Sequence, residues 1–436
     1  MGNVKKSSVF KGIALSTIML VSGFAGTPLT TNAAENEAET AVWSRQDAQD
    51  YDLSKDNTAP NIDNVDEVAP DYWVWDTWPL RNRDGSIAQI NGYQVVFALT
   101  ASREYTWGGR HDEAQIRYFY SKNGKDWKMG GLAYDSEDAL GARQWAGSAM
   151  MDDDGKVHLF YTATGRKGEE QTTFEQRLAK TTFDIEADKK SKSVELSNFG
   201  EHEILAEADG EYYETQEQKT GNIIYSFRDP WFFQDPKTGK EYLIFEGNTA
   251  GDDKSLDPEN IGDADFRSSH DVPAGAEDYN GNVGIAEAQN EDLTDFELLP
   301  PLLEANGVNQ QLERPHLLVK GGDYYLFTIT HKFTFAPGLT GPDGLYGFTN
   351  DSLRGDYEPL NGNGLVVANP EDDPFMTYSH AVMPNGTVIS FVNEYRDENG
   401  ELQYGGTFAP TLKLSIHGNE TKVNGALKPG QIMPSH

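Results

Sequence analysis

The sequence of 436 residues contains no cysteine. The protein therefore has no disulfide bonds, no thiolate metal ligands and no cysteine nucleophile. A chain of this length can bury a core that is stable without covalent cross-links. Its hydrophobic content of 37% and aromatic content of 11% are typical of globular proteins. We therefore expect one large folded domain rather than several small ones.

Basic residues are scarce. Lys and Arg number 36 against 70 Asp and Glu, so the formal net charge is −34. Nucleic acids and anionic membrane surfaces repel such a charge, which excludes both as partners. The acidic residues are spread along the chain, which indicates a strongly solvated surface. Adaptation to salty or alkaline surroundings is a hypothesis that follows from this composition.

Long apolar runs are absent after the N-terminal region. Lys5 and Lys6 precede an apolar stretch at 13–24, and small residues at 31–34 offer a cleavage site. A membrane anchor is the alternative, but the stretch is short and contains Ser and Thr. The pattern predicts a secretion signal peptide over 1–34. The mature protein is then secreted, extracellular and free of the membrane.

A sequence motif that occurs five times accounts for most of the remaining chain. It begins after an acidic leader or wrapping segment at 35–70, and we expect 71–436 to form a single domain. Each copy has a polar or aromatic opening, an apolar run, a glycine-containing turn and a second apolar run. The openings lie at 75–80, 145–148, 228–230, 313–315 and 379–382.

Each copy is typical of a β-hairpin. In three copies, an acid followed by an aromatic residue predicts an additional outer strand: Asp126-Trp127, Asp295-Phe296 and Asp356-Tyr357. Repeated units of several strands favour an all-β fold, a five-bladed β-propeller, over a β-sandwich with coincidental hairpins. The first strand of each blade then lines a central funnel. The inserts at 187–221 and 249–280 are expected to be loops over one face.

Three of the openings carry an acid at what we interpret as equivalent places of the repeat: Asp76, Asp229 and Glu313. Retaining glycosidases need an ionised carboxylate as nucleophile and a carboxylic acid with a raised pKa. The short Asp suits attack, the longer Glu reaches a leaving-group oxygen, and a third carboxylate can hold sugar hydroxyls. The alternative for each single motif is a turn with a local ion pair. Their shared place in the repeat favours a catalytic site.

The neighbouring residues fit such a site. Tryptophans at 73, 75 and 78 are expected to form an apolar wall against a sugar ring. Proline after Asp229 and after Arg314 is expected to hold both residues in extended geometry. Arg228 and Arg314 supply forked donors for hydroxyls or carboxylates.

At these residues the chain resembles the bacterial levansucrase and inulosucrase family, the sucrose-dependent fructosyltransferases of glycoside hydrolase family 68. The resemblance runs from about residue 42 to the C-terminus, through the motifs at 75–80, 228–230 and 313–315. Further matches lie at 145–148, 378–380 and 406–410. It implies a five-bladed propeller with a funnel-shaped acidic pocket.

The resemblance also implies roles for individual residues. Asp76 corresponds to the nucleophile, Asp229 to the transition-state stabiliser and Glu313 to the acid/base. The positions that shape the sucrose pocket in the family correspond here to Trp75, Trp145, Arg228 and Tyr378.

The chain departs from the family pattern at several positions. Ala146 stands where many members have Ser, Gln311 where several have Glu, and His331 where Gram-positive members have Arg. We expect these three residues to contact substrate and, together with Arg314, to decide what receives the fructose. A structural calcium occurs in Gram-positive members, but its ligand positions correspond here to Ile223 and Gln310, which are poor oxygen ligands. The prediction is therefore a protein without a cofactor or metal.

The resulting hypothesis is a secreted fructosyltransferase, a levansucrase or inulosucrase, with sucrose and fructan or oligosaccharide acceptors as partners. We expect a monomer. A β-fructofuranosidase that mainly hydrolyses sucrose is the first alternative. Another furanoside hydrolase, such as an arabinan-degrading propeller, and a non-catalytic glycan-binding propeller are the others. Levan and inulin linkage stay equally open.

Overall fold

Strands dominate the residues that the computed structural model describes, which are 40–62, 64–171, 173–188, 190, 192–251 and 254–433. They belong to one compact unit. The signal peptide predicted over 1–34 lies outside the described residues.

Among the described residues the strand pairings form five blades, and each blade begins with its innermost strand. The first blade consists of β2 (Tyr72–Asn82), β3 (Gln94–Ser102), β4 (Gln115–Ser121) and β5 (Lys128–Leu132). The second consists of β6 (Arg143–Met151), β7 (Lys156–Thr164), β8 (Gln176–Asp188), β9 (Ser193–Ser197) and β10 (Glu203–Glu207). The third is β11 (Phe227–Gln234), β12 (Glu241–Asn248), β13 (Gly281–Ala288) and β14 (Phe296–Glu304). The fourth consists of β15 (Glu313–Lys320), β16 (Asp323–Thr330), β17 (Gly344–Asn350), β18 (Glu358–Pro359) and β19 (Leu365–Ala368). The fifth consists of β20 (Thr377–Val382), β21 (Thr387–Arg396), β22 (Leu402–Phe408), β23 (Pro410–His417) and β24 (Glu420–Pro429).

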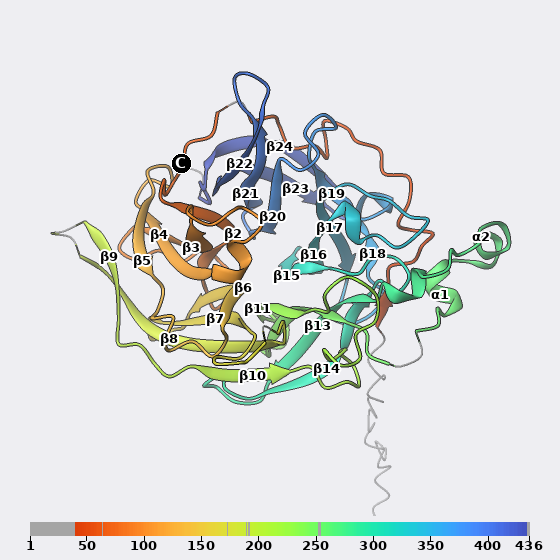
Figure 1. Cartoon of the computed structure of the whole chain (residues 1–436), viewed down its shortest axis with the longest axis horizontal. Helices are drawn as coiled ribbons and strands as arrows, with labels where there is room; N and C mark the ends of the chain where they lie inside the picture. Colours follow the sequence, from red (N-terminus) through yellow and green to blue (C-terminus); the bar gives the residue numbers. More distant parts are fainter. Residues whose placement is uncertain are drawn as a thin grey trace, which may run out of the picture. The chain divides into compact units, whose positions relative to one another are not determined.

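The five innermost strands surround a common axis. In Figure 1 β2, β6, β11, β15 and β20 lie at the centre and the later strands of each blade lie farther out. Each inner strand contacts the next around the ring, and β20 contacts β2. Parallel pairing of β2 with β6 also joins the first two blades into one sheet. The predicted five-bladed propeller is confirmed, and the ring brings the five openings to one end of the funnel.

Helices are short and lie in the connections. They are η1 (Arg110–Glu113), α1 (Pro258–Ile261), α2 (Ala264–Ser269), η2 (Ala276–Asp278), η3 (Lys332–Thr334) and η4 (Leu360–Gly362). Three of them, α1, α2 and η2, occupy the insert at 249–280. The connection from β16 to β17 contains η3 and passes beside the funnel mouth.

The acidic N-terminal segment packs against the third and fourth blades. Its strand β1 (Ala41–Val42) pairs in parallel with β14. The next residue, Trp43, is fully buried against Phe335, Tyr346 and Phe348. Farther on, Thr58 forms a bridge with Ala368. Burial of a large indole stabilises this attachment by about 2–3 kcal/mol.

The outer strands agree with the sequence pattern in three blades. Strands β5, β14 and β18 begin at or directly after the acid-aromatic pairs. The prediction for 187–221 is wrong in part, because this insert contributes β9 and β10, which both pair with β8 and complete the edge of the second blade. That edge has no acid-aromatic pair, and its short strands alternate too little to stand out from a polar loop.

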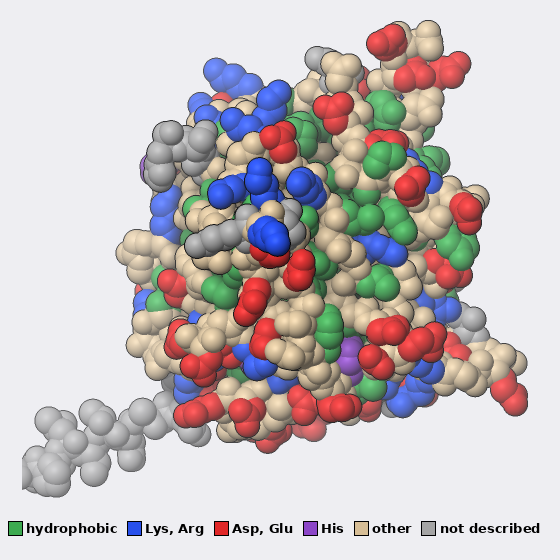
Figure 2. All heavy atoms as spheres, turned by 90° about the vertical axis from the view of Figure 1, so that its left-hand side faces the viewer, with side chains coloured by type: hydrophobic (Ala, Val, Ile, Leu, Met, Phe, Trp, Pro, Cys, Tyr) green, Lys and Arg blue, Asp and Glu red, His purple; other side chains and the backbone are tan. Residues whose placement is uncertain are grey.

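On the face drawn in Figure 2 acidic side chains are spread widely, while Lys and Arg gather toward its upper left. Within the described part of the chain, no helix has the length and apolar character needed to cross a bilayer.

Candidate active site

Every inner strand is interrupted by a β-bulge at the funnel mouth. The pairing with the second strand shifts directly after Trp75, Trp145, Arg228, Glu313 and Tyr378. A bulge bends a strand and redirects its side chains, and such bulges occur next to active sites. In the second blade Gly147 permits the bend, because a Cβ there would collide with the carbonyl oxygen of Phe160.

The common register places the mouth residues in two rings. The last paired residue before each bulge is Trp75, Trp145, Arg228, Glu313 or Tyr378, and the first residue inside it is Asp76, Ala146, Asp229, Arg314 or Ser379. The interpretation that the three acids occupy equivalent places is therefore wrong by one position for Glu313. Asp76 and Asp229 belong to one ring, and Glu313 belongs to the other.

Four residues of the second ring have a left-handed backbone. Their φ angles are 39° at Asp76, 63° at Asp229, 47° at Arg314 and 61° at Ser379. The expectation of extended geometry before Pro230 and Pro315 is thus wrong. The bulge overrides the local preference of a residue that precedes proline. Positive φ costs free energy for residues other than glycine and is often found at functional sites.

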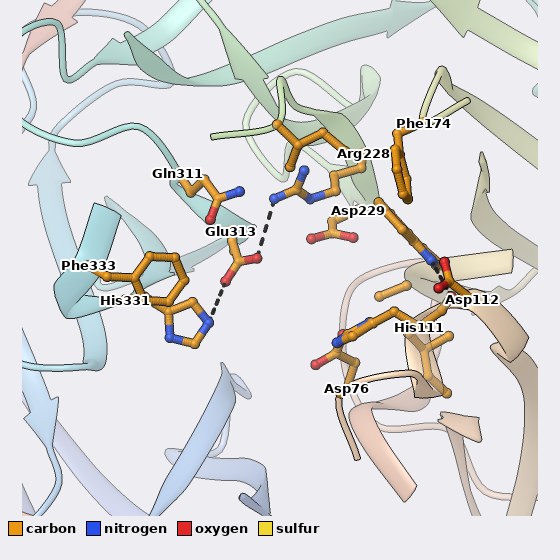
Figure 3. A pocket seen from close by; sticks show the side chains of 15 residues that line it. Asp76, His111, Asp112, Phe174, Arg228, Asp229, Gln311, Glu313, His331 and Phe333 are labelled. Carbon is orange, nitrogen blue, oxygen red and sulfur yellow. Dashed lines mark hydrogen bonds and ion pairs between the residues drawn. The ribbon is translucent and has the colours of Figure 1, made fainter. Parts of the chain in front are cut away.

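The mouth encloses a cavity of about 470 Å³. All three predicted acids line it, and Figure 3 shows their carboxylates directed into the same space. Cavities of roughly 300–1,000 Å³ are typical of small-molecule sites. The prediction that Asp76, Asp229 and Glu313 converge at the mouth is met by this geometry.

Glu313 is held from three sides. Arg228 Nη2 donates to its Oε1 over 3.3 Å, and the Tyr378 hydroxyl donates to its Oε2. His331 Nε2 lies 3.7 Å from the same Oε2. Figure 3 shows Glu313 pointing between Arg228 and His331. Such contacts fix the rotamer of a long carboxylate and leave it facing the cavity.

Arg228 is anchored by a second acid behind the cavity. Glu246, fully buried on β12, forms an ion pair with Arg228, with Oε2 at 2.8 Å from Nε, and its Oε1 accepts from Arg228 Nη2 over 3.0 Å. Burial lowers the pKa of Arg228, but Glu246 and then Glu313 raise it above its ordinary value. The guanidinium therefore stays charged and rigid, as a forked donor between two carboxylates.

Arg314 and Ser379 act on the Asp76 carboxyl together. Arg314 Nη1 donates to Ser379 Oγ over 2.6 Å, and the Ser379 hydroxyl lowers the pKa of Asp76. Burial raises the pKa of Asp76, Arg314 opposes the rise, and the Glu313 charge adds to it. Arg314 and Ser379 thus favour the ionised form that a nucleophile requires.

Asp229 is the more deeply buried of the two aspartates in its ring. Its backbone N–H donates to Thr162 Oγ1 over 2.8 Å, and Oδ2 accepts from the Arg314 backbone N–H over 3.3 Å. Burial raises its pKa to about 7, against the lowering effects of Arg228 and Arg314. A carboxyl group near its midpoint can both accept and donate hydrogen bonds to sugar hydroxyls.

His331 is oriented by a carboxylate on the side away from the cavity. Its Nδ1 lies 2.7 Å from Asp343 Oδ2, and its ring stacks on Tyr378 with centroids 3.9 Å apart. Burial lowers the pKa of His331, but Asp343 and Glu313 raise it above the ordinary value overall. A protonated imidazole is therefore favoured beside Glu313.

The other predicted contact residues divide into two groups. Trp145, Ala146 and Gln311 line the cavity together with Arg228 and His331. Trp75, Arg314 and Tyr378 are buried behind that lining, and Trp75 packs edge-on against His111.

The expected wall of tryptophans is not at the cavity. Trp78 is fully buried and stacks on Phe97, and Trp73 packs on Trp107. Apolar lining comes instead from Trp145, and from Phe174 and Phe333, which are 39% and 66% exposed.

The two positions that correspond to calcium ligands do not form an oxygen cage. Ile223 has an aliphatic side chain, and Gln310 Oε1 accepts from the Asn280 backbone N–H over 3.2 Å. These residues do not fit a calcium ion.

Several residues of the site escaped sequence reasoning. Glu246 and Asp343 orient Arg228 and His331, while His111, Phe174 and Phe333 line the cavity. Glu246 was accessible in principle, because it faces Arg228 across the predicted hairpin. No local pattern marks the others, which come from connections between strands.

The chain is similar in sequence to proteins of one family. A family model described as Levansucrase/Invertase matches residues 31–433. A levansucrase of Rahnella aquatilis is 39% identical over 90% of the chain and 96% of its own length. A levansucrase of Zymomonas mobilis is 40% identical over 91% of the chain and 93% of its length.

Solved structures are similar as well. An inulosucrase from Halalkalicoccus jeotgali bound to kestose has a TM-score of 0.81 at 43% identity, over 90% of this chain and 97% of that one. A β-fructofuranosidase from Microbacterium saccharophilum has a TM-score of 0.82 at 33% identity, over 92% and 87%.

Proposed function

The chain belongs to the levansucrase/invertase family, glycoside hydrolase family 68, and we propose that it is a sucrose-dependent fructosyltransferase that works by double displacement. Sucrose is the donor, and sucrose, fructan or water is the acceptor. The observation that carries the proposal is the convergence of Asp76, Asp229 and Glu313 on one cavity of about 470 Å³.

In the first step the Asp76 carboxylate attacks C2 of the fructosyl unit. The bond between C2 and the glycosidic oxygen breaks, and Glu313 transfers its proton to that oxygen, so that glucose leaves. Asp229 accepts hydrogen bonds from fructosyl hydroxyls, which favours the positive charge that develops on the ring. Arg228 and Tyr378 hold the Glu313 carboxylate at the place where the leaving oxygen arrives.

In the second step a hydroxyl group attacks C2 of the fructosyl ester. Glu313, now ionised, takes the proton of that hydroxyl, and the bond to Asp76 breaks. Two inversions at C2 leave the configuration unchanged. Transfer and hydrolysis share this step and differ only in which hydroxyl is bound, so residues around His331 and Phe333 set the ratio.

A second candidate is a β-fructofuranosidase that mainly hydrolyses sucrose. The structural similarity to such an enzyme from Microbacterium saccharophilum favours keeping it. Both candidates use the same first step, and they differ in the fate of the fructosyl group.

Incubation with concentrated sucrose tests the proposal. Transfer releases more glucose than free fructose, hydrolysis releases equal amounts, and linkage analysis of the products separates levan from inulin. Asp76→Asn is expected to lose at least a thousandfold in rate, because no covalent intermediate can form. Asp84→Asn, an exposed turn residue, is the matched control. Turnover by Asp76→Asn at the control's rate would refute the mechanism.

We further propose that the protein is secreted. The charged, apolar and small-residue pattern at 1–34 supports export. N-terminal sequencing of the protein from culture medium is expected to begin close to residue 35.

A further inference from the structure

A second cavity of about 570 Å³ lies next to the active site. Its lining comes from the N-terminal segment near Leu53, from the connection between β16 and β17, and from the segment that precedes β20. His331 lies in the connection between β16 and β17, and Tyr378 lies in β20, directly after the third of these segments. The cavity is therefore on the mouth side of the fourth and fifth blades.

The two cavities share a wall. His331 and Phe333 line the active site, as the left side of Figure 3 shows, and Lys332 between them lines the second cavity. Asp343 also lines the second cavity and holds this wall, with Oδ2 at His331 Nδ1 and Oδ1 accepting from the Lys332 backbone N–H over 2.6 Å. A chain that extended from the active site past His331 and Phe333 would reach the second cavity.

The lining has the chemistry of a carbohydrate site. Phe375 and Leu53 leave 38% and 39% of their surface exposed, which provides apolar faces for sugar rings. Asp50 and Glu371 offer acceptors for hydroxyl groups, and the exposed Lys332 offers a donor. The acidic lining repels phosphates and acidic sugars, so a neutral polyhydroxy ligand fits best.

The aromatic face is held in position before any ligand binds. The backbone carbonyl of Phe375 accepts from Asn393 Nδ2 over 2.8 Å, and that of Pro374 accepts from Asn369 Nδ2 over 3.1 Å. Arg396 pairs with Asp373 over 2.8 Å in the same segment. A fixed platform loses less entropy on binding than a mobile one.

We propose that the second cavity binds fructosyl units of the growing fructan, at a distance from the reacting end. This inference rests on the proposed function. Occupation of both cavities by one chain keeps the product bound between transfers, because the second contact becomes intramolecular. Long chains are then extended in preference to short ones.

Binding is measured first, in the full-length Asp76→Asn variant, which leaves added oligosaccharides intact. Longer levan-type or inulin-type oligosaccharides are expected to bind more tightly than kestose, by calorimetric titration. Adding Phe375→Ala or Leu53→Asn weakens binding of the long chains about tenfold and leaves kestose unchanged. Phe199→Ala removes an aromatic ring with 51% exposure on the second blade and serves as the matched control.

Product length is measured second, in the otherwise unaltered enzyme. Phe375→Ala is expected to release glucose from sucrose within about twofold of the parent rate, yet to make shorter products. Equal affinity for kestose and long chains, or long-chain affinity unaffected by both substitutions, would overturn the inference. Failure of the parent to release glucose would instead refute the proposed function, and the binding experiment is independent of that result.

Discussion

Replacement of Asp229 by Asn is expected to stabilise the protein at neutral pH while abolishing its activity. The carboxyl group is buried, and its pKa is raised from 3.8 to about 7. Ionising it in the folded protein therefore costs about 4 kcal/mol, because each pKa unit corresponds to about 1.4 kcal/mol. Asn mimics the neutral form and keeps an oxygen that can accept from the Arg314 backbone N–H.

The pH dependence has a definite sign. The folded protein binds the Asp229 proton more tightly than the unfolded chain, so this group's stabilising effect is complete below pH 3.8 and is lost as the pH rises to about 7. The variant has no such loss of stability. The free energy of unfolding of the variant should therefore exceed that of the parent by an amount that grows between about pH 4 and pH 7 and stays constant above that range.

Above pH 7 the free energy of unfolding of the variant should exceed that of the parent by about 2–4 kcal/mol. The lower value applies where cavity water solvates one carboxylate oxygen of the parent. An unfolding entropy of about 2.1 cal/mol/K per residue gives about 0.8 kcal/mol/K for about 400 residues. The melting temperature should then rise by about 2–5 °C, measured by calorimetry from pH 4 to pH 8.

Asp235→Asn is the matched control, since Asp235 is also buried and directly follows β11. Burial raises the pKa of Asp235, but hydrogen bonds from Tyr324 and Thr238 lower it below its ordinary value overall. Its replacement should destabilise the protein at neutral pH, and the effect should disappear as the pH falls. A destabilised Asp229→Asn protein at pH 7.5, or an advantage that does not change with pH, would refute the reasoning.

Three further outcomes are expected. Glu313→Gln should lower kcat on sucrose by about 10²–10⁴-fold, with most activity retained on a fructosyl donor whose leaving group needs no proton; equal losses on both donors would contradict the acid role. Tyr378→Phe should lower kcat about 10–100-fold, the range expected for a hydrogen bond to a charged group, with less effect on KM, whereas Tyr404→Phe at the exposed end of β22 should behave as the parent. Treatment with EDTA should leave the melting temperature unchanged, because Ile223 and Gln310 do not provide a calcium site; a decrease that calcium reverses would show that ligands exist elsewhere.

Much of the fold could be predicted because the repeat is recognisable from short-range sequence patterns. Alternating apolar runs joined by glycine turns define hairpins, and their fivefold recurrence leaves few architectures open. The three acids were found for the same reason, since each lies at the start of one copy of the repeated motif. The edge of the second blade was missed, because β9 and β10 are short and are specified by pairing with β8 rather than by their own composition.

The details of the site depended on tertiary structure. A bulge has no dependable local signature, so neither the shift after Glu313 nor the left-handed backbone at Asp229 could be derived from the sequence. Proline after Asp229 even pointed the other way. Phe174 and Phe333 reach the cavity from connections whose course is set by the blades around them.

The two-ring arrangement gives a physical reason for the choice of Asp and Glu. Four of the five residues that begin the bulges have a left-handed backbone, a conformation that Asp tolerates better than most residues. Asp76 and Asp229 therefore hold short carboxylates in fixed positions. Glu313 precedes its bulge and depends on Arg228 and Tyr378 for its orientation. Strained backbone of this kind costs about 1–3 kcal/mol per residue, which persists only because the surrounding blades are rigid. A rigidly held Asp76 is suited to attack on one fixed carbon. The longer Glu313, which is held by side chains, is suited to contact a leaving oxygen first and an acceptor hydroxyl afterwards.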